Sequence, residues 1–162
     1  MPFSLELILF SGLCLFGLRL LLRAHRRRPI TVNRAPAVID GDTLVSNDTR
    51  IRLFGIDAPE MSHPHGAAAR AALGAALRVH GACPIIIQPR ERDRYGRLVA
   101  RVLASDGTDL AERMVAQGFA RAATGYTRAY AGAERRARRS RAGLWSQRGG
   151  IGDPAAWRRR HA

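Results

Sequence analysis

Hydrophobic residues are distributed along this chain in two different ways. Near the N-terminus, residues 7–22 are apolar or small with Arg19 as the single exception, and an arginine-rich stretch follows at 23–28. A helix needs about 20 apolar residues to span a bilayer. We therefore expect residues 1–28 to form an N-terminal hydrophobic helix that anchors the protein in a membrane through residues 3–22.

Two other interpretations of this segment stay open. A cleaved signal peptide has positive charge before its apolar stretch and a small-residue cleavage site after it. Here Glu6 precedes the stretch and arginines follow it, so the flanks fit an anchor better. A buried helix of a soluble protein is the third interpretation.

Beyond this segment the pattern changes to short apolar runs separated by turn residues. Strands are predicted where these runs alternate or are continuously apolar: 37–39, 44–45, 50–56, 85–87 and 98–103. The residues at 46–48 favour a tight turn, so the first three strands should form an antiparallel meander. The last two strands should pair across the loop 89–97.

Helical spacing of apolar residues predicts three helices, each followed by a glycine that favours a helix end: 65–80, 110–117 and 130–142. Short strands with interposed helices indicate an α+β fold, mainly β, with helices packed outside a small barrel. We expect this domain over residues 37–147, after a linker at 29–36 and before a basic, flexible tail at 148–162.

The charge balance narrows the choice of partners. Of 162 residues, 27 are Lys or Arg, all of them Arg, and 13 are acidic, which gives a formal net charge of +14. Genomic base composition can explain the choice of Arg over Lys, but it does not explain the surplus over acidic residues. Such a surplus points to a polyanion, either nucleic acid or an anionic membrane surface. The two cysteines, Cys14 and Cys83, lack the spacing of a zinc site.

Four acidic residues are concentrated in two short turns of this basic chain: Asp40, Asp42, Asp57 and Glu60. Each turn taken singly is compatible with ordinary turn chemistry, because Asp, Gly and Pro favour turns in any protein. Clustered carboxylates are also the oxygen ligands that Ca²⁺ and Mg²⁺ prefer.

Two arginines favour the interpretation of these carboxylates as a divalent-cation site. Arg52 precedes Asp57 on an alternating strand, and Arg97 ends the loop 93–97. A cation held by carboxylates and flanked by planar guanidiniums can stabilise charge in the transition state of phosphoryl transfer. A further carboxylate can then activate or orient water.

Three motifs occur in order along this region: Val-Ile-Asp-Gly-Asp-Thr at 38–43, Arg-Leu-Phe-Gly-Ile-Asp-Ala-Pro-Glu at 52–60, and Asp-Arg-Tyr-Gly-Arg at 93–97. Together they resemble the staphylococcal nuclease (thermonuclease) family, with a similarity that spans about 37–147. The resemblance implies a five-stranded OB-fold barrel with about three helices.

The resemblance also implies Ca²⁺ as the cofactor. The carboxylates of Asp42 and Asp57 and the backbone carbonyl of Ala58 would be its protein ligands, and Asp40 would orient waters around it. Ala58 stands where the best-known member of the family has Thr, a difference that a carbonyl ligand tolerates.

The reaction implied is calcium-dependent endonucleolytic hydrolysis of DNA and RNA. Arg52 would bind the scissile phosphate, Glu60 would act as general base or orient water, and Arg97 would stabilise the transition state and assist the leaving oxygen. Water would attack phosphorus and the 5′ P–O bond would break, leaving 3′-phosphate and 5′-hydroxyl ends. Substrate contacts are expected from three more residues: Arg94, Tyr95 and Tyr126.

Two other functions stay open: a catalytically inactive OB module that binds nucleic acid while tethered to a membrane, and a basic membrane-surface adaptor. An inactive module should have lost Arg52, Glu60 or Arg97, and this chain retains all three. We expect a monomer that is membrane-anchored, or secreted or periplasmic if the N-terminal segment is cleaved. The arginine flank favours a cytoplasmic domain, whereas a calcium-dependent nuclease suits an extracytoplasmic space, so the side of the membrane stays open.

Overall fold

A computed structural model describes residues 28–81 and 83–161. The predicted anchor at residues 3–22 lies outside these residues. In the part of the chain that is described, no helix is long and apolar enough to cross a membrane. Membrane attachment therefore stays a prediction from sequence.

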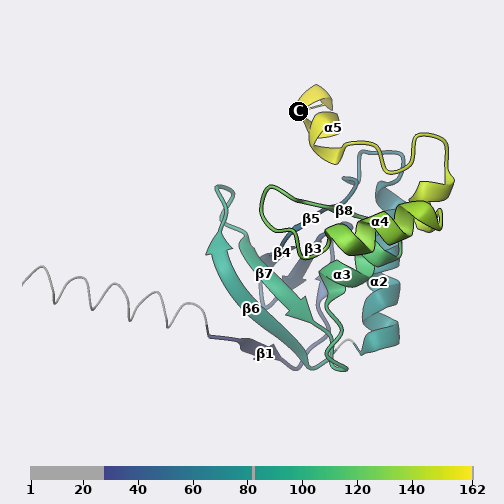
Figure 1. Cartoon of the computed structure of the whole chain (residues 1–162). Coiled ribbons are helices and arrows are strands. Elements are labelled where there is room, and N and C mark those ends of the chain that lie inside the picture. Colours follow the sequence, from purple (N-terminus) through teal and green to yellow (C-terminus); the bar gives the residue numbers. More distant parts are fainter. Residues whose placement is uncertain (1–27, 82, 162) are drawn as a thin grey trace, which may run out of the picture.

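The strands assemble into one six-stranded, curled sheet (Figure 1). Its members are β1 (Ile30–Val32), β2 (Ala37–Val38), β3 (Thr43–Ser46), β4 (Thr49–Leu53), β6 (Ile85–Arg92) and β7 (Leu98–Leu103). They lie in the order β1-β6-β7-β4-β3-β2, with β4 parallel to β7. The predicted meander β2-β3-β4 and the predicted pairing of β6 with β7 are confirmed.

The sheet has six strands where five were predicted, because its first strand is interrupted. β1 pairs with β6 at one edge and β2 pairs with β3 at the other, although only residues 33–36 separate β1 from β2. Pro36 lies in this interruption and has no N–H to donate to a sheet. One stretch of chain therefore borders both edges of the curled sheet. The segment 29–36, predicted to be a linker, carries β1, and that prediction is corrected.

A tight turn after β4 leads the chain into the short strand that carries Asp57. The strand was expected to run further, but it ends at Leu53, and Gly55 adopts a φ of +78°. A Cβ at Gly55 would lie 2.5 Å from Cγ2 of Thr127, so the position requires glycine for space as well as for conformation. Two short strands then pair in a second sheet: β5 (Ile56–Asp57) and β8 (Arg121–Ala122).

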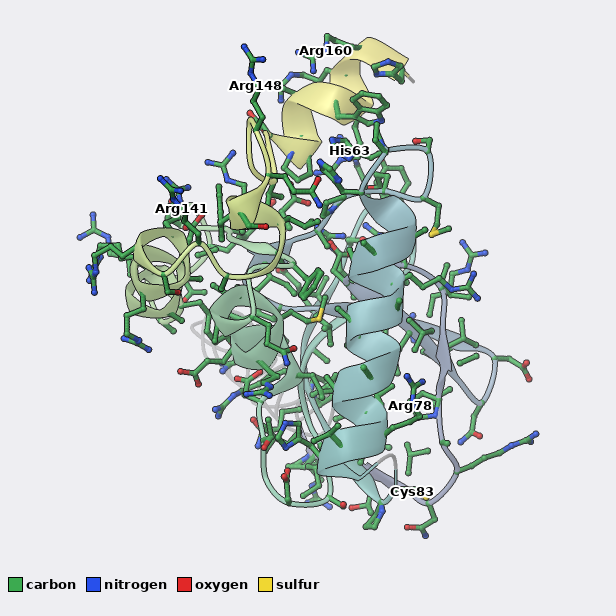
Figure 2. The ribbon with its side chains drawn as sticks, turned by 90° about the vertical axis from the view of Figure 1, so that its right-hand side faces the viewer. His63, Arg78, Cys83, Arg141, Arg148 and Arg160 are labelled. Atoms are coloured by element: carbon green, nitrogen blue, oxygen red, sulfur yellow. The ribbon has the colours of Figure 1, made fainter. Side chains whose placement is uncertain are left out.

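The three predicted helices are confirmed as α2 (Gly66–His80), α3 (Leu110–Ala116) and α4 (Ala131–Arg139). They lie together on one side of the curled sheet, and the view in Figure 2 shows α2 in front of it. The core between the layers is aliphatic: Leu44, Leu73, Val102 and Met114 are all 0% exposed. The prediction of an α+β fold that is mainly β is confirmed in this form.

The C-terminal segment 148–162, predicted to be a flexible tail, carries a further helix. A 3₁₀-helix, η1 (Gly143–Ser146), leads to α5 (Pro154–His161). The side chain of Asp153 accepts a hydrogen bond from the Ala156 N–H at 3.1 Å, and Ile151 in the connection between η1 and α5 is fully buried. Asp followed by Pro is a local signal for a helix start, and it outweighs the polar composition on which the tail was predicted.

A buried carboxylate joins α3 and α4 to the sheet. Asp109 accepts from the Ala111 N–H at 2.9 Å and so caps α3. Its other oxygen accepts from Arg101 Nε at 2.7 Å and from the Tyr130 hydroxyl at 2.9 Å. Burial, followed by the charge of Asp109, raises the pKa of Tyr130, so this hydroxyl stays protonated and remains a donor at neutral pH.

Replacing Asp109 with Ala is expected to lower the free energy of unfolding by about 3 kcal/mol, because it removes a helix cap and leaves buried donors without an acceptor. The measurement is urea denaturation followed by circular dichroism. Asp106→Ala is the control, because the Asp106 side chain is 47% exposed. Equal losses in the two variants would show that the buried network is not what stabilises this junction.

Candidate active site

The site is built around the buried carboxylate of Asp42, which lies just before β3 and is 3% exposed. Its Oδ1 accepts from Thr43 Oγ1 at 3.0 Å, and its Oδ2 accepts from the backbone N–H of Ala58 at 3.0 Å. The second contact crosses from the turn before β3 to the end of β5. The two motifs that carry the acidic residues are therefore joined by a direct hydrogen bond.

Arg52 on β4 connects both predicted metal-binding carboxylates. Its NH1 lies 2.6 Å from Oδ1 of Asp42 and its NH2 lies 3.0 Å from Oδ1 of Asp57. NH2 also donates to the carbonyl of Ile56 at 3.4 Å. The guanidinium plane is thus fixed by partners from two different turns, which is the rigidity that a bidentate group needs.

Burial and neighbouring charges have opposite effects on the pKa values of Asp42 and Arg52. Burial raises the pKa of Asp42 above its usual range, and the charge of Arg52 opposes that rise. Burial disfavours the charged form of Arg52, but Asp42 and Asp57 outweigh it and raise the pKa of the guanidinium. Arg52 is therefore a permanent cation between two carboxylates.

A second arginine, which the sequence did not point to, binds the same acidic cluster from helix α5. Arg158 NH2 lies 2.9 Å from Oδ1 and 3.0 Å from Oδ2 of Asp57. Its NH1 lies 2.8 Å from Oε1 of Glu60. Asp57 is thus shared by two guanidiniums, while Glu60 is held by Arg158.

Arg97 approaches the site from the loop between β6 and β7. Its Nε donates to Oδ2 of Asp93 at 2.8 Å, and its guanidinium lies 5.5 Å from the ring centre of Tyr95. Arg94 lies 4.9 Å from the same ring. Hydrogen bonds from Arg97 and Tyr95 outweigh the effect of burial and lower the pKa of Asp93, so the carboxylate that orients Arg97 is ionised at neutral pH.

One cavity of about 1230 Å³ connects these groups. Seven of the predicted site residues line it: Arg52, Asp57, Glu60, Arg94, Tyr95, Arg97 and Tyr126. Tyr95 and Tyr126 are 69% and 76% exposed, so their rings are accessible to a ligand. The basic and aromatic lining suits a phosphate-bearing chain.

Three predicted residues are not among those that line the cavity. Asp42 is covered by Arg52, and Ala58 is 2% exposed. Asp40 accepts from the Asp42 N–H at 3.0 Å through its Oδ1, so it stabilises the turn that carries Asp42. Access to Asp42 from the cavity therefore runs past the Arg52 guanidinium.

Comparison with known proteins gives one family. The model of the staphylococcal nuclease homologue family matches residues 50–147. Protein ParB of Escherichia coli is 33% identical over 86% of this chain and 91% of its own length. A protein named micrococcal nuclease from Shigella flexneri is 36% identical over 75% of this chain and 77% of its own length. An uncharacterized endonuclease of Escherichia coli O157:H7 is 32% identical over 78% and 84%, respectively.

Proposed function

The chain belongs to the staphylococcal nuclease family and is a phosphodiester-hydrolysing endonuclease, and from this premise we propose that it is a calcium-dependent enzyme that cleaves DNA and RNA to 3′-phosphate and 5′-hydroxyl ends. One observation carries the proposal: a single guanidinium, that of Arg52, is bound to both Asp42 and Asp57 at the wall of the basic cavity. Phosphoryl transfer needs this combination of fixed positive charge and carboxylates.

The donor chemistry fits Ca²⁺. The groups that converge are carboxylate oxygens, which hard cations prefer, and they come from Asp42 and Asp57. Among the described residues, no group of three or more His, Cys, Asp and Glu side chains is placed to hold a metal, so the proposed site has only two carboxylate ligands. With the Ala58 carbonyl as third ligand the site is sparse, so we expect weak binding, with a Kd on the order of 10⁻⁴–10⁻³ M. When bound, Ca²⁺ would supply charge that stabilises the phosphate oxygens.

The protein's own residues would divide the remaining work. Arg52 is in place to hold the scissile phosphate, because its fork is fixed at the cavity wall. Glu60 lines the same cavity and would accept a proton from the attacking water or orient that water. Arg97, held by Asp93, would neutralise charge on the pentavalent phosphorus and at the leaving oxygen.

Substrate binding is proposed to depend on phosphates and stacking more than on base edges. Arg94 lies beside the exposed ring of Tyr95, and Tyr126 lines the same cavity from the segment that follows β8. Exposed aromatic rings stack on any base, so they discriminate little between sequences. The proposal therefore includes both DNA and RNA.

The OB-fold prediction belongs to the same proposal. The parallel pairing of β4 with β7, and the segment 30–38 that borders both sheet edges, support a partly open barrel of this class. Family members with this fold that only bind nucleic acid are the alternative, and the retained Arg52, Glu60 and Arg97 disfavour it. The proposals of a monomer and of a membrane anchor at residues 3–22 rest on the sequence alone.

Incubation of the full chain with supercoiled plasmid or single-stranded RNA is expected to give calcium-dependent cleavage that a chelator stops. The control is the Arg52→Ala, Glu60→Ala double variant purified in the same way, which separates the enzyme's activity from that of a contaminant. Products should resist polymerase extension until a phosphatase removes the 3′-phosphate. Intact DNA binding without any cleavage would instead support the inactive binding module.

A further inference from the structure

We propose that Arg158 of helix α5 competes with a divalent cation for the oxygen atoms of Asp57, so that α5 is a cap that restrains cation binding at the active site. The inference rests on the proposed function, in which Asp57 is a ligand of Ca²⁺. It concerns a helix outside residues 50–147, the region that the family model matches.

The oxygens of Asp57 are already engaged by cations of the protein itself. Arg158 NH2 lies 2.9 Å and 3.0 Å from the two carboxylate oxygens, and Arg52 NH2 lies 3.0 Å from one of them. A divalent cation needs the same lone pairs, and it would repel a guanidinium held on them at this distance. The contact of Arg158 NH2 with both oxygens of Asp57 therefore competes directly with metal ligation by Asp57.

The same arginine also engages the proposed water-activating residue. Arg158 NH1 lies 2.8 Å from Oε1 of Glu60. One side chain thus neutralises two of the acidic groups that face the cavity, and it does so from the C-terminal end of the chain. Departure of Arg158 would free Oδ2 of Asp57 for the cation and Glu60 for water in one movement.

Of the two arginines on Asp57, Arg158 is the one that can leave. Arg52 projects from a strand paired on both sides and also holds buried Asp42, and its side chain is 17% exposed. Arg158 is 37% exposed and lies on a short terminal helix. Exposed ion pairs contribute little to stability, so a cation can displace this one at modest cost.

The other contacts of α5 near the site are few and largely aromatic. Trp157 stacks on His161 with ring centres 3.8 Å apart, and its ring meets His63 edge-on at 4.6 Å. Its Nε1 donates to Ser62 Oγ at 3.4 Å, a long hydrogen bond. Figure 2 shows His63 between α5 and the N-terminal end of α2, whereas Arg160 lies at the outer end of α5. Trp157 is therefore a built-in reporter of whether α5 stays docked.

The decisive experiment is isothermal titration of CaCl₂ into the full chain without nucleic acid. Arg158→Ala is expected to lower the Kd for Ca²⁺ by about fivefold, the upper end of what loss of a partly exposed ion pair gives. Arg160→Ala removes the same charge from the same helix without touching the carboxylates, and its Kd should stay within about twofold of wild type. Arg158→Gln, which leaves a shorter, polar and uncharged side chain, should behave like Arg158→Ala.

A second readout follows the helix itself. Addition of Ca²⁺ should change tryptophan emission in the wild-type chain with the same midpoint as the calorimetric titration, and this change should be absent from Trp157→Phe. An unchanged or weaker Ca²⁺ affinity in Arg158→Ala would overturn the proposal and would point to a structural or phosphate-binding role for Arg158. Failure of the wild-type chain to bind Ca²⁺ at all would also overturn it.

The cap and the nuclease can fail separately. If the wild-type chain cleaves nucleic acid with Ca²⁺ but Arg158→Ala has the same Ca²⁺ affinity as wild type, the nuclease proposal stands and the cap proposal is disproved. If Arg158→Ala binds Ca²⁺ more tightly than wild type but neither protein cleaves nucleic acid, the cap proposal stands and the proposed reaction is disproved.

Discussion

Replacing Arg52 with Lys is expected to lower kcat by about 10²–10³-fold, the size of effect that follows loss of one fixed donor to a developing oxyanion. The variant keeps the positive charge that Asp42 and Asp57 require, but an ammonium is a point charge and cannot span both carboxylates as the guanidinium does. The measurement is steady-state cleavage of a short labelled DNA at saturating Ca²⁺.

The matched control is Arg78→Lys, because Arg78 is exposed at the end of α2 far from His63 and the site (Figure 2). This variant should keep kcat within about twofold of wild type, as expected for a surface change. Thermal unfolding of Arg52→Lys must be followed as well, since Asp42 is buried and depends on its partner. A folded Arg52→Lys variant with near-normal kcat would contradict the proposed role of the planar fork.

Glu60→Gln is expected to lower kcat by about 10²–10⁴-fold while KM changes only a few-fold, because an amide cannot take a proton from water. The substitution preserves shape, and the amide oxygen can still accept the hydrogen bond that Arg158 now donates to Oε1 at 2.8 Å. Cleavage rates over a range of substrate concentrations separate the two constants.

Glu112→Gln provides the control for this change, since Glu112 is exposed on α3 and is not among the residues that line the cavity. If Glu60→Gln instead raised KM as much as it lowered kcat, Glu60 would be a substrate-binding residue and not the group that activates water. If both constants stayed normal, the base would have to be sought elsewhere in the cavity.

Local sequence patterns predicted most of the secondary structure, because whether a segment forms a helix or a strand depends largely on residues a few positions apart. The helical spacing at 65–80 became α2, and the alternation at 98–103 became β7. Prediction failed where one residue interrupted a pattern: Gly55 ended β4 and redirected the chain into β5. The space around Gly55 is limited by Thr127 and Tyr130, which lie far along the chain, so no local pattern could have shown it.

The motifs identified the candidate site, because a reactive constellation needs particular residue types at particular places. Arg52, Asp57, Glu60 and Arg97 were chosen from sequence, and all four line one cavity. Their chemical roles stay predictions until the variants are measured. The structure adds that Asp42 lies behind Arg52, which sequence spacing alone does not reveal.

By itself, the sequence determined the mixed fold, the polyanionic partner class and the family motifs, since each depends on composition or on residues that lie close together in the sequence. Only the tertiary structure decided that residues 30–38 border both edges of the sheet and that Arg158 lies on Asp57 and Glu60. In a chain with 27 arginines, one more in a basic tail carries no distinguishing signal. Its importance comes from a contact across 101 positions, and such a contact exists only once the chain has folded.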